Sequence, residues 1–183
     1  MDEIAAEMID REAALADFDH ARDDFELAFS QVPDEALDYK PEGDDYAIAD
    51  LVAHITGSIQ RYSRQLDLMK EAEYQELRLV ADAQEAELIE RHRKARTDAT
   101  RKAKNRQAAL DEMEAAHDEL AAKLRDMAYD DYARLAPVYY PGSQEVYPTR
   151  PADVSGWLAD HYREHIPHVA GLLERWNVGT LER

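Results

Sequence analysis

The chain of 183 residues contains no cysteine, six glycines and seven prolines. Without cysteine it has no disulfide, no thiolate ligand and no cysteine nucleophile, so imidazole and carboxylate groups must hold any metal. It also lacks an apolar run long enough to cross a bilayer. Its acidic first residues have neither the basic start nor the apolar core of a secretory signal. We therefore expect a cytoplasmic protein with no membrane partner.

Positive charge is scarce as well. The sequence has 22 lysines and arginines against 40 aspartates and glutamates, which gives a formal net charge of −18. A chain this acidic repels phosphate backbones, so we expect no nucleic-acid partner. The basic stretch at residues 90–106 is interpreted as a solvated helix face or a connection between helices. A nucleic-acid-binding arm at residues 70–105 is an alternative that the global charge argues against.

Four segments carry apolar residues at spacings of three, four and seven, which is typical of helices with one buried face. They cover about residues 2–31, 47–69, 107–128 and 152–176. Turn-rich loops are expected at residues 33–46 and 129–151, the second containing several prolines and tyrosines. Residues 70–105 form a charged helical or connecting section, with a turn expected between residues 84 and 100. The pattern predicts an all-α four-helix bundle that makes one domain over residues 1–183.

Histidines carry the candidate chemistry. His161 and His165 are four residues apart, so their rings lie one above the other on one helical face, within an apolar stripe. Buried imidazoles need partners for their ring nitrogens, and this spacing suits two ligands of one metal ion. His54 lies early in the second segment, at the edge of its stripe. Three imidazoles from two helices would leave coordination positions open for water or substrate, as in catalytic zinc sites. Alternatively, each is an ordinary core or boundary histidine.

The remaining histidines are given other roles. His168 is interpreted as a boundary residue at the end of the bundle, with a role as a substitute ligand or as a partner of the ligands left open. His117 lies on the apolar stripe of the third segment and is expected to be a hydrogen-bonded core residue. His20 is expected to be exposed. His92 lies in the basic stretch and has no apparent partner.

Arg22 is a candidate substrate-binding residue. It lies between Phe18 and Phe25 on the inward stripe of the first segment, where an unpaired charge is costly. It could clamp a substrate carboxylate, reach toward solvent, or form an ion pair with a neighbouring helix. Asp160 and Glu164 flank the histidine pair, but helical geometry places them at the bundle edge, so neither is given a catalytic role.

Two segments resemble the DinB/YfiT-like superfamily. The run YAIADLVAHI, from Tyr46 past His54, is similar to the aromatic, small and apolar lead into L-x-x-H in that family's second helix. The run from Gly156 to Ile166 resembles its fourth-helix pattern, H-x-x-x-H followed by an apolar residue. The resemblance implies a four-helix bundle in up-down-down-up order and frequent dimerisation. It also implies a site for zinc, nickel or another divalent metal such as iron at His54, His161 and His165.

Characterised relatives include thiol transferases and isomerases that use small thiols, and metal-dependent hydrolases. The leading hypothesis is therefore a metal-dependent enzyme, a small-thiol transferase or a hydrolase, that acts on a small molecule and forms a homodimer. Any thiol would be external, because the chain has none. The alternative is a non-catalytic binding or stress-response scaffold with a structural metal or none.

Two departures from the family pattern bear on the site. Tyr46 stands where many relatives have tryptophan. Pro167 follows His165 by two residues and cannot donate a hydrogen bond to the carbonyl of Arg163, so a kink is expected there.

Overall fold

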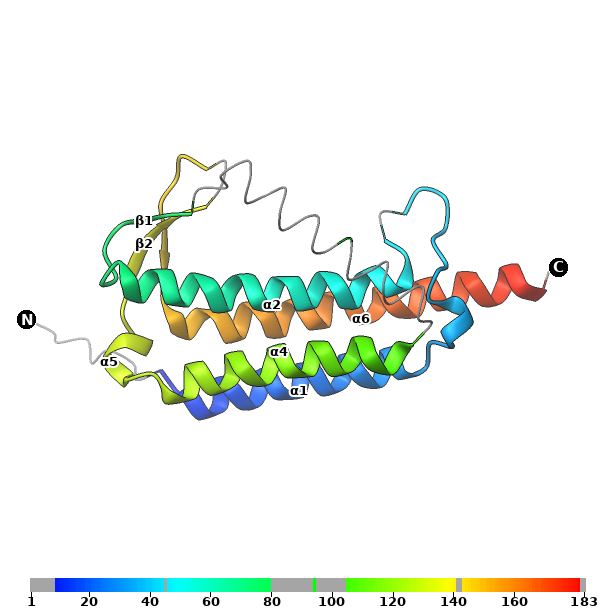
Figure 1. Ribbon diagram of the computed structural model, residues 1–183, viewed down its shortest axis with the longest axis horizontal. Coiled ribbons are helices and arrows are strands. Elements are labelled where there is room, and N and C mark those ends of the chain that lie inside the picture. The colour runs from blue at the N-terminus through cyan, green and yellow to red at the C-terminus, as the bar shows by residue number, and fades with distance from the viewer. Residues whose placement is uncertain (1–8, 45, 80–93, 95–104, 141–142, 182–183) are drawn as a thin grey trace, which may run out of the picture.

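The computed structural model describes residues 9–44, 46–79, 94, 105–140 and 143–181. Four long helices dominate this part of the chain: α1 (Arg11–Ser30), α2 (Ile48–Glu71), α4 (Arg106–Asp126) and α6 (Pro151–Leu181). As Figure 1 shows, α1 and α6 run in one direction while α2 and α4 run in the other. The closest packing is α1 on α6 and α2 on α4. This up-down-down-up arrangement confirms the predicted four-helix bundle.

Side-chain caps set three of the helix starts. Asp10 has an extended backbone, and its carboxylate accepts the N–H of Ala13 at 3.0 Å, so α1 begins at Arg11. The prediction of a helix from residue 2 was therefore wrong for residues 9 and 10, and residues 1–8 lie outside the described part. Asn105 caps α4 in the same way, and Asp50 of α2 accepts the backbone N–H of Ala47 at 2.8 Å. A pattern of apolar residues alone does not predict polar caps of this kind.

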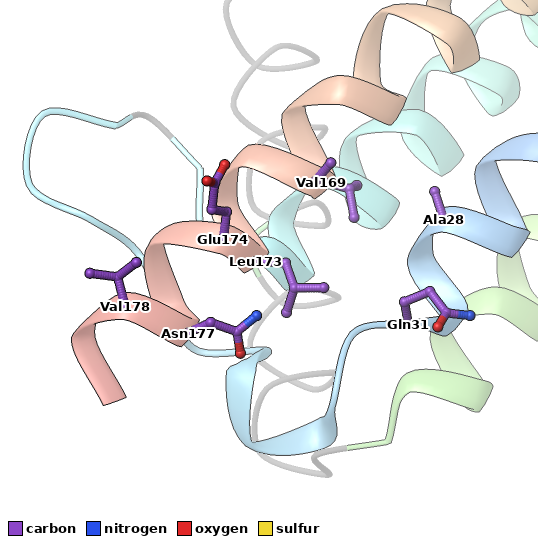
Figure 2. A pocket seen from close by; sticks show the side chains of 8 residues that line it. Ala28, Gln31, Val169, Leu173, Glu174, Asn177 and Val178 are labelled. Atoms are coloured by element: carbon purple, nitrogen blue, oxygen red, sulfur yellow. The ribbon is translucent and has the colours of Figure 1, made fainter. Parts of the chain in front are cut away.

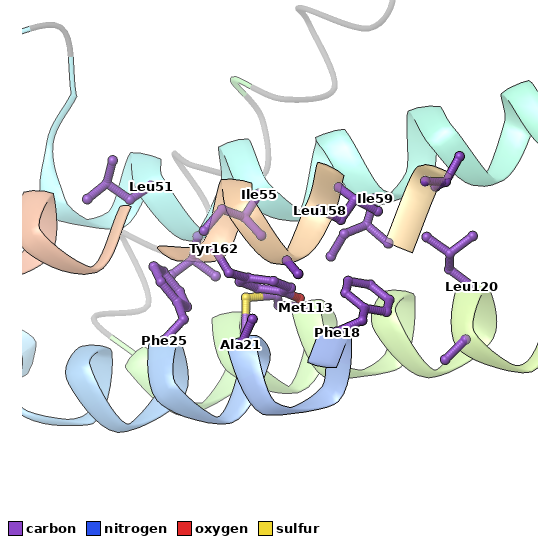
Figure 3. Packing of buried hydrophobic residues seen from close by; sticks show 14 of the residues in the cluster. Phe18, Ala21, Phe25, Leu51, Ile55, Ile59, Met113, Leu120, Leu158 and Tyr162 are labelled. Carbon is purple, nitrogen blue, oxygen red and sulfur yellow. The ribbon is translucent and has the colours of Figure 1, made fainter. Parts of the chain in front are cut away.

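The apolar stripes of the four helices meet in one core, shown in Figure 3. Phe18 and Phe25 of α1, Ile55 of α2, Met113 of α4 and Tyr162 of α6 are all fully buried. Burying each large apolar side chain contributes on the order of 1.5–3 kcal/mol. This shared core fixes α2 against α6, and so sets the relative positions of the residues on their facing sides.

A small sheet and a short helix lie at one end of the bundle, and all of them except strand β1 fall within the predicted loop at residues 129–151. Strand β1 (Leu77–Arg78) pairs in parallel with β2 (Ala136–Tyr139), which pairs antiparallel with β3 (Tyr147–Thr149). The short helix α5 (Tyr129–Tyr132) precedes β2, and a 3-10 turn, η1 (Asp34–Ala36), follows α1. The prediction of a loop throughout residues 129–151 was wrong, because alternating burial in a four-residue strand is too short to recognise from sequence.

Helix α6 is longer than predicted and continues through Pro167 to Leu181. The proline does not end the helix, because its ring removes one hydrogen bond while the neighbouring turns keep theirs. A kink at this position stays a prediction.

Other predictions fall on residues that the structure does not describe. These are the turn between residues 84 and 100, most of the basic stretch, and His92. Among the described helices, none is both long and apolar enough to cross a bilayer.

Candidate metal centre

Three histidines lie together where α2 faces α6. The ring centroid of His54 is 4.9 Å from that of His161 and 5.2 Å from that of His165, and the latter two are 4.7 Å apart. One ring nitrogen from each histidine lies within 4.8 Å of the other two. Nitrogens this close can reach a single ion by side-chain rotation, since zinc lies about 2.0–2.1 Å from its imidazole ligands. The structure thus brings together the three residues that the sequence selected.

The buried nitrogens of the two α6 histidines have no partner among the described residues. They are Nε2 of His161 and both ring nitrogens of His165. His165 is only 8% exposed, and a buried polar atom without a hydrogen bond costs about 1–3 kcal/mol. Burial, together with the neighbouring His161, lowers the pKa of His165 to about 4. Both rings are therefore neutral at neutral pH and offer lone pairs, which is the state that binds a metal.

Glu164 accounts for the other nitrogen of His161. Its carboxylate lies 3.7 Å from Nδ1 of His161, and its side chain is 76% exposed. Burial lowers the pKa of His161, and Glu164 opposes that shift. A carboxylate beside one nitrogen favours a proton there and leaves the other nitrogen as the ligand atom. Asp160 is 82% exposed and pairs with Arg163 at 3.5 Å, so the predicted position of both acids at the bundle edge is confirmed.

Tyr46 covers one side of the cluster. Its ring centroid lies 5.4 Å from that of His54 and 6.4 Å from that of His165. Asp44 holds this tyrosine in place, because its carboxylate accepts the backbone N–H of Tyr46 at 3.2 Å and a hydrogen bond from Arg175 of α6 at 2.7 Å. Burial opposes the ionisation of Asp44, but these hydrogen bonds hold its pKa below the usual value. The loop before α2 is thus fastened to α6 by an ionised carboxylate.

His168 also contacts Asp44, the residue that joins the loop before α2 to α6. Its Nε2 lies 3.4 Å from Asp44, and its side chain is 28% exposed. Its ring is nearly parallel to that of His165, with centroids 5.9 Å apart. The position agrees with a boundary residue that has a polar partner.

Three residues beside the cluster were not singled out from the sequence: Arg61 and Tyr62 of α2, and Trp157 of α6. The Arg61 guanidinium carbon lies 5.3 Å from the centre of the Tyr62 ring, and the Tyr62 and Trp157 rings are 5.9 Å apart. The charge of Arg61 adds to burial in lowering the pKa of His161. Helical spacing could have revealed two of them, since Arg61 follows His54 by seven residues and Trp157 precedes His161 by four.

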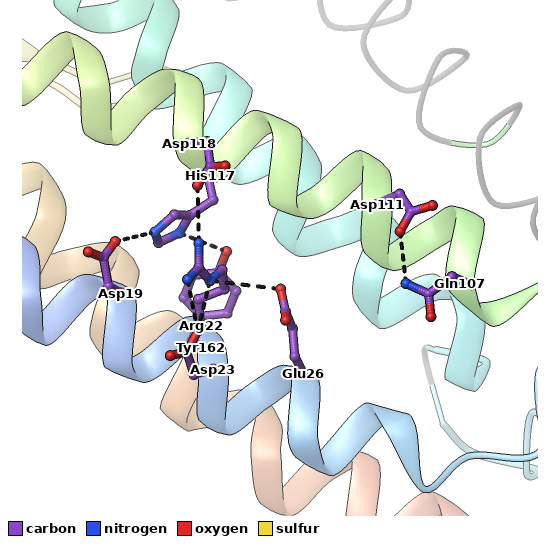
Figure 4. A network of polar contacts seen from close by, with 9 residues as sticks. All are labelled: Asp19, Arg22, Asp23, Glu26, Gln107, Asp111, His117, Asp118 and Tyr162. Atoms are coloured by element: carbon purple, nitrogen blue, oxygen red, sulfur yellow. Dashed lines mark hydrogen bonds and ion pairs between the residues drawn. The ribbon is translucent and has the colours of Figure 1, made fainter.

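Arg22 lies between α1 and α4 in a network of acidic side chains, drawn in Figure 4. Its guanidinium donates to Asp23 at 2.8 Å and to Asp118 at 3.1 Å, and lies 3.8 Å from Glu26. Its side chain is 17% exposed. These contacts agree with the alternative of an ion pair to a neighbouring helix.

His117 is fully buried in the same region. Its Nε2 lies 2.9 Å from Asp19, its Nδ1 lies 3.3 Å from the Tyr162 hydroxyl, and its ring stacks on Phe18. The prediction of a hydrogen-bonded core histidine is confirmed. His20, with 72% of its side chain exposed, is also where the sequence placed it.

An apolar groove of about 450 Å³ lies further along α6, against the end of α1 (Figure 2). Its lining includes Ala28 of α1, Gln31 just after α1, and Val169, Leu173 and Val178 of α6. None of the three clustered histidines contributes to this groove.

Comparison with known proteins agrees with this architecture. The family model of the DinB superfamily matches residues 17–169, and no curated protein matches the sequence. Among solved structures, the chain is similar to YfiT from Bacillus subtilis, described as a probable metal-dependent hydrolase with an unusual four-helix bundle topology. The TM-score is 0.67 at 17% identity, over 97% of this chain and 93% of the other. An identity this low shows a shared fold. The family match covers most of the chain, which therefore belongs to the DinB superfamily.

Proposed function

We propose that this chain is a metal-dependent enzyme that acts on a small molecule, as a hydrolase or as a small-thiol transferase. His54, His161 and His165 would hold the metal ion. The observation that carries the proposal is the convergence of three imidazoles, of which His161 and His165 together have three buried nitrogens without a partner among the described residues. The description of YfiT as a probable metal-dependent hydrolase supports it. Imidazole suits zinc, nickel and iron. Zinc and nickel are the first choices because the DinB resemblance names them, and iron is the next.

Three neutral ligands leave the ion its full charge. When bound, such an ion supplies Lewis-acid chemistry, lowering the pKa of water or of a thiol toward neutrality. The chain's own residues prepare the site for it. Burial favours the neutral forms of His161 and His165, the Glu164 carboxylate lies beside Nδ1 of His161, and the Tyr46 ring lies beside that of His54. A thiol substrate would have to come from outside, since the chain has no cysteine.

Further parts of the proposal concern the whole molecule. We propose one domain over residues 1–183, a homodimer and a cytoplasmic location. Arg22 remains a candidate clamp for a substrate carboxylate, but it would have to exchange Asp23 or Asp118 for the substrate.

The test is the metal content of the protein purified without a histidine tag, measured by mass spectrometry. We expect about one equivalent of metal in the wild type and none in His161→Ala/His165→Ala, with the helical circular dichroism unchanged. The exposed His20→Ala variant is the matched control and should keep its metal. Absence of metal in the wild type, even after reconstitution with zinc or nickel, would overturn the proposal and favour the scaffold alternative.

Metal-loaded protein can then be assayed for the reaction. Ester hydrolysis is followed with p-nitrophenyl acetate, and thiol transfer with 1-chloro-2,4-dinitrobenzene and a panel of small thiols. Activity that disappears in the double variant would identify the reaction class.

A further inference from the structure

Arg61, Tyr62 and Trp157 form a patch beside the histidine cluster, which we call the arginine–aromatic patch. The helices α2 and α6 run in opposite directions. Residues that follow His54 on α2 and residues that precede His161 on α6 therefore lie toward the same end of the cluster. The contact between the Tyr62 and Trp157 rings, 5.9 Å apart, joins the two helices there. The patch thus adjoins the candidate metal site directly.

Arg61 differs from the other arginines near the bundle centre. Arg22 is held by Asp23 and Asp118, Arg163 by Asp17, and Arg175 by Asp44. Arg61 is exposed, and its contacts with described residues are to Tyr62, over the ring and by a side-chain hydrogen bond, and, through its charge, to His161. A guanidinium without a carboxylate partner among the described residues keeps its fork of donors available for an anion.

Trp157 supplies the apolar part of the patch. It is 38% exposed. It lies on α6, which carries two of the three histidines. An exposed large aromatic residue beside a cation can bind the apolar body of a ligand whose charged end pairs with that cation. Along α2, Arg61 lies about 10 Å from His54, at about 1.5 Å per residue. That separation suits a ligand a few bonds long between its reacting group and its charged end.

We propose that the arginine–aromatic patch binds the carboxylate end of the substrate. The carboxylate pairs with Arg61, the apolar body lies on Trp157 and Tyr62, and the reacting group reaches the metal between the three histidines. A singly charged carboxylate is favoured over a phosphate, because the chain carries a net charge of −18 and repels a dianion more strongly. This inference rests on the proposed function, since it assumes a metal at the histidine cluster.

The probe is 3-phenylpropionate, which has one carboxylate on a short apolar body, titrated calorimetrically into zinc-loaded protein. Arg61→Gln is expected to weaken its binding about tenfold, the size of one charge-assisted hydrogen-bonded contact at an exposed site. The matched control is Arg64→Gln, which removes the same charge from the same helix. Arg64 lies in a separate hollow with Lys123 and Glu119 of α4, so this variant should bind the probe as the wild type does.

Two further ligands separate charge from apolar contact. The neutral amide 3-phenylpropionamide should bind wild type and Arg61→Gln equally, whereas Trp157→Ala should weaken both the acid and the amide. Phenyl phosphate, which is largely a dianion at neutral pH, should bind more weakly than the carboxylate. Tighter binding of the phosphate would overturn the assignment to a carboxylate.

The zinc content of every sample is measured alongside the titrations. If the zinc is retained but the acid does not bind, or binds Arg61→Gln as well as wild type, the patch proposal is overturned and the metal site stands. Wild-type protein that takes up no zinc overturns the proposed function itself, and the patch proposal with it.

Discussion

Replacing each of two buried histidines by leucine is expected to have opposite effects on the stability of the metal-free protein. His165 is 8% exposed and has two ring nitrogens without a partner among the described residues. His117 is fully buried, and both of its nitrogens have partners, Asp19 and Tyr162. The two substitutions therefore compare a histidine whose ring nitrogens are available to a ligand with one whose ring nitrogens already have partners in the core.

The magnitudes follow from the cost of unpaired polar groups. An unsatisfied buried donor or acceptor costs about 1–3 kcal/mol, whereas replacing it by an apolar group of similar shape removes that cost. His165→Leu should raise the free energy of unfolding by about 1–2 kcal/mol, which is a rise in Tm of about 2–8 °C for a chain of this size. His117→Leu should lower the same free energy by about 2–3 kcal/mol, because it leaves Asp19 and the Tyr162 hydroxyl without their partner.

With zinc bound, the wild type is expected to be more stable than His165→Leu, the reverse of the order expected for the metal-free proteins. A ligand that binds only the folded state stabilises it by about 2.7 kcal/mol at a hundred times its Kd. Wild-type protein should gain this and His165→Leu should not. The assay is urea unfolding followed by circular dichroism at 222 nm, with EDTA and with zinc. If His165→Leu in EDTA loses as much stability as His117→Leu, the His165 nitrogens have structural partners and the reasoning fails.

Acid should destabilise the metal-free protein. The pKa of His165 is near 4 in the folded state against an ordinary 6.5, so the unfolded chain binds more protons between those values, and stability present above pH 6.5 is lost toward pH 4. Urea unfolding against pH should show a shallower slope for His165→Leu. Asp44→Asn should weaken zinc binding about tenfold in a chelator competition by loosening Tyr46, while exposed Asp38→Asn in the same loop should not. Arg22→Gln should lower the unfolding free energy and leave 3-phenylpropionate binding unchanged, and weaker binding would instead support Arg22 as the carboxylate clamp.

The four helices could be predicted because each buries one long apolar stripe. Phe18 and Phe25 in α1, or Ile55 and Ile59 in α2, repeat over several turns, and such a pattern has no other common explanation. The start of α1 could not be predicted in this way, because it is set by the Asp10 cap, which a pattern of apolar residues does not reveal. Strands β2 and β3 could not be predicted for a different reason: they are four and three residues long, and β2 also pairs with β1, which is far from it in sequence.

The histidine cluster was predicted from one local spacing and one resemblance. His161 and His165 share a face by helical geometry, whereas the approach of His54 depends on how α2 packs on α6, which only the family pattern suggested. Asp44 could not be found, because its role comes from a loop contact with Arg175. The position of Arg61 on the same face of α2 as His54 could have been predicted from helical spacing. Its place beside the cluster depends on the packing of α2 against α6, which the sequence does not show.

X-ray absorption at the zinc edge of zinc-loaded protein reports the atoms bound to the metal, so it tests whether the three histidines are its ligands. We expect three imidazole nitrogens at about 2.0–2.1 Å together with a light-atom ligand from water, and loss of the imidazole signal in His161→Ala/His165→Ala. A shell of oxygen ligands without imidazole, or an imidazole signal that survives in the double variant, would contradict a metal site at His54, His161 and His165.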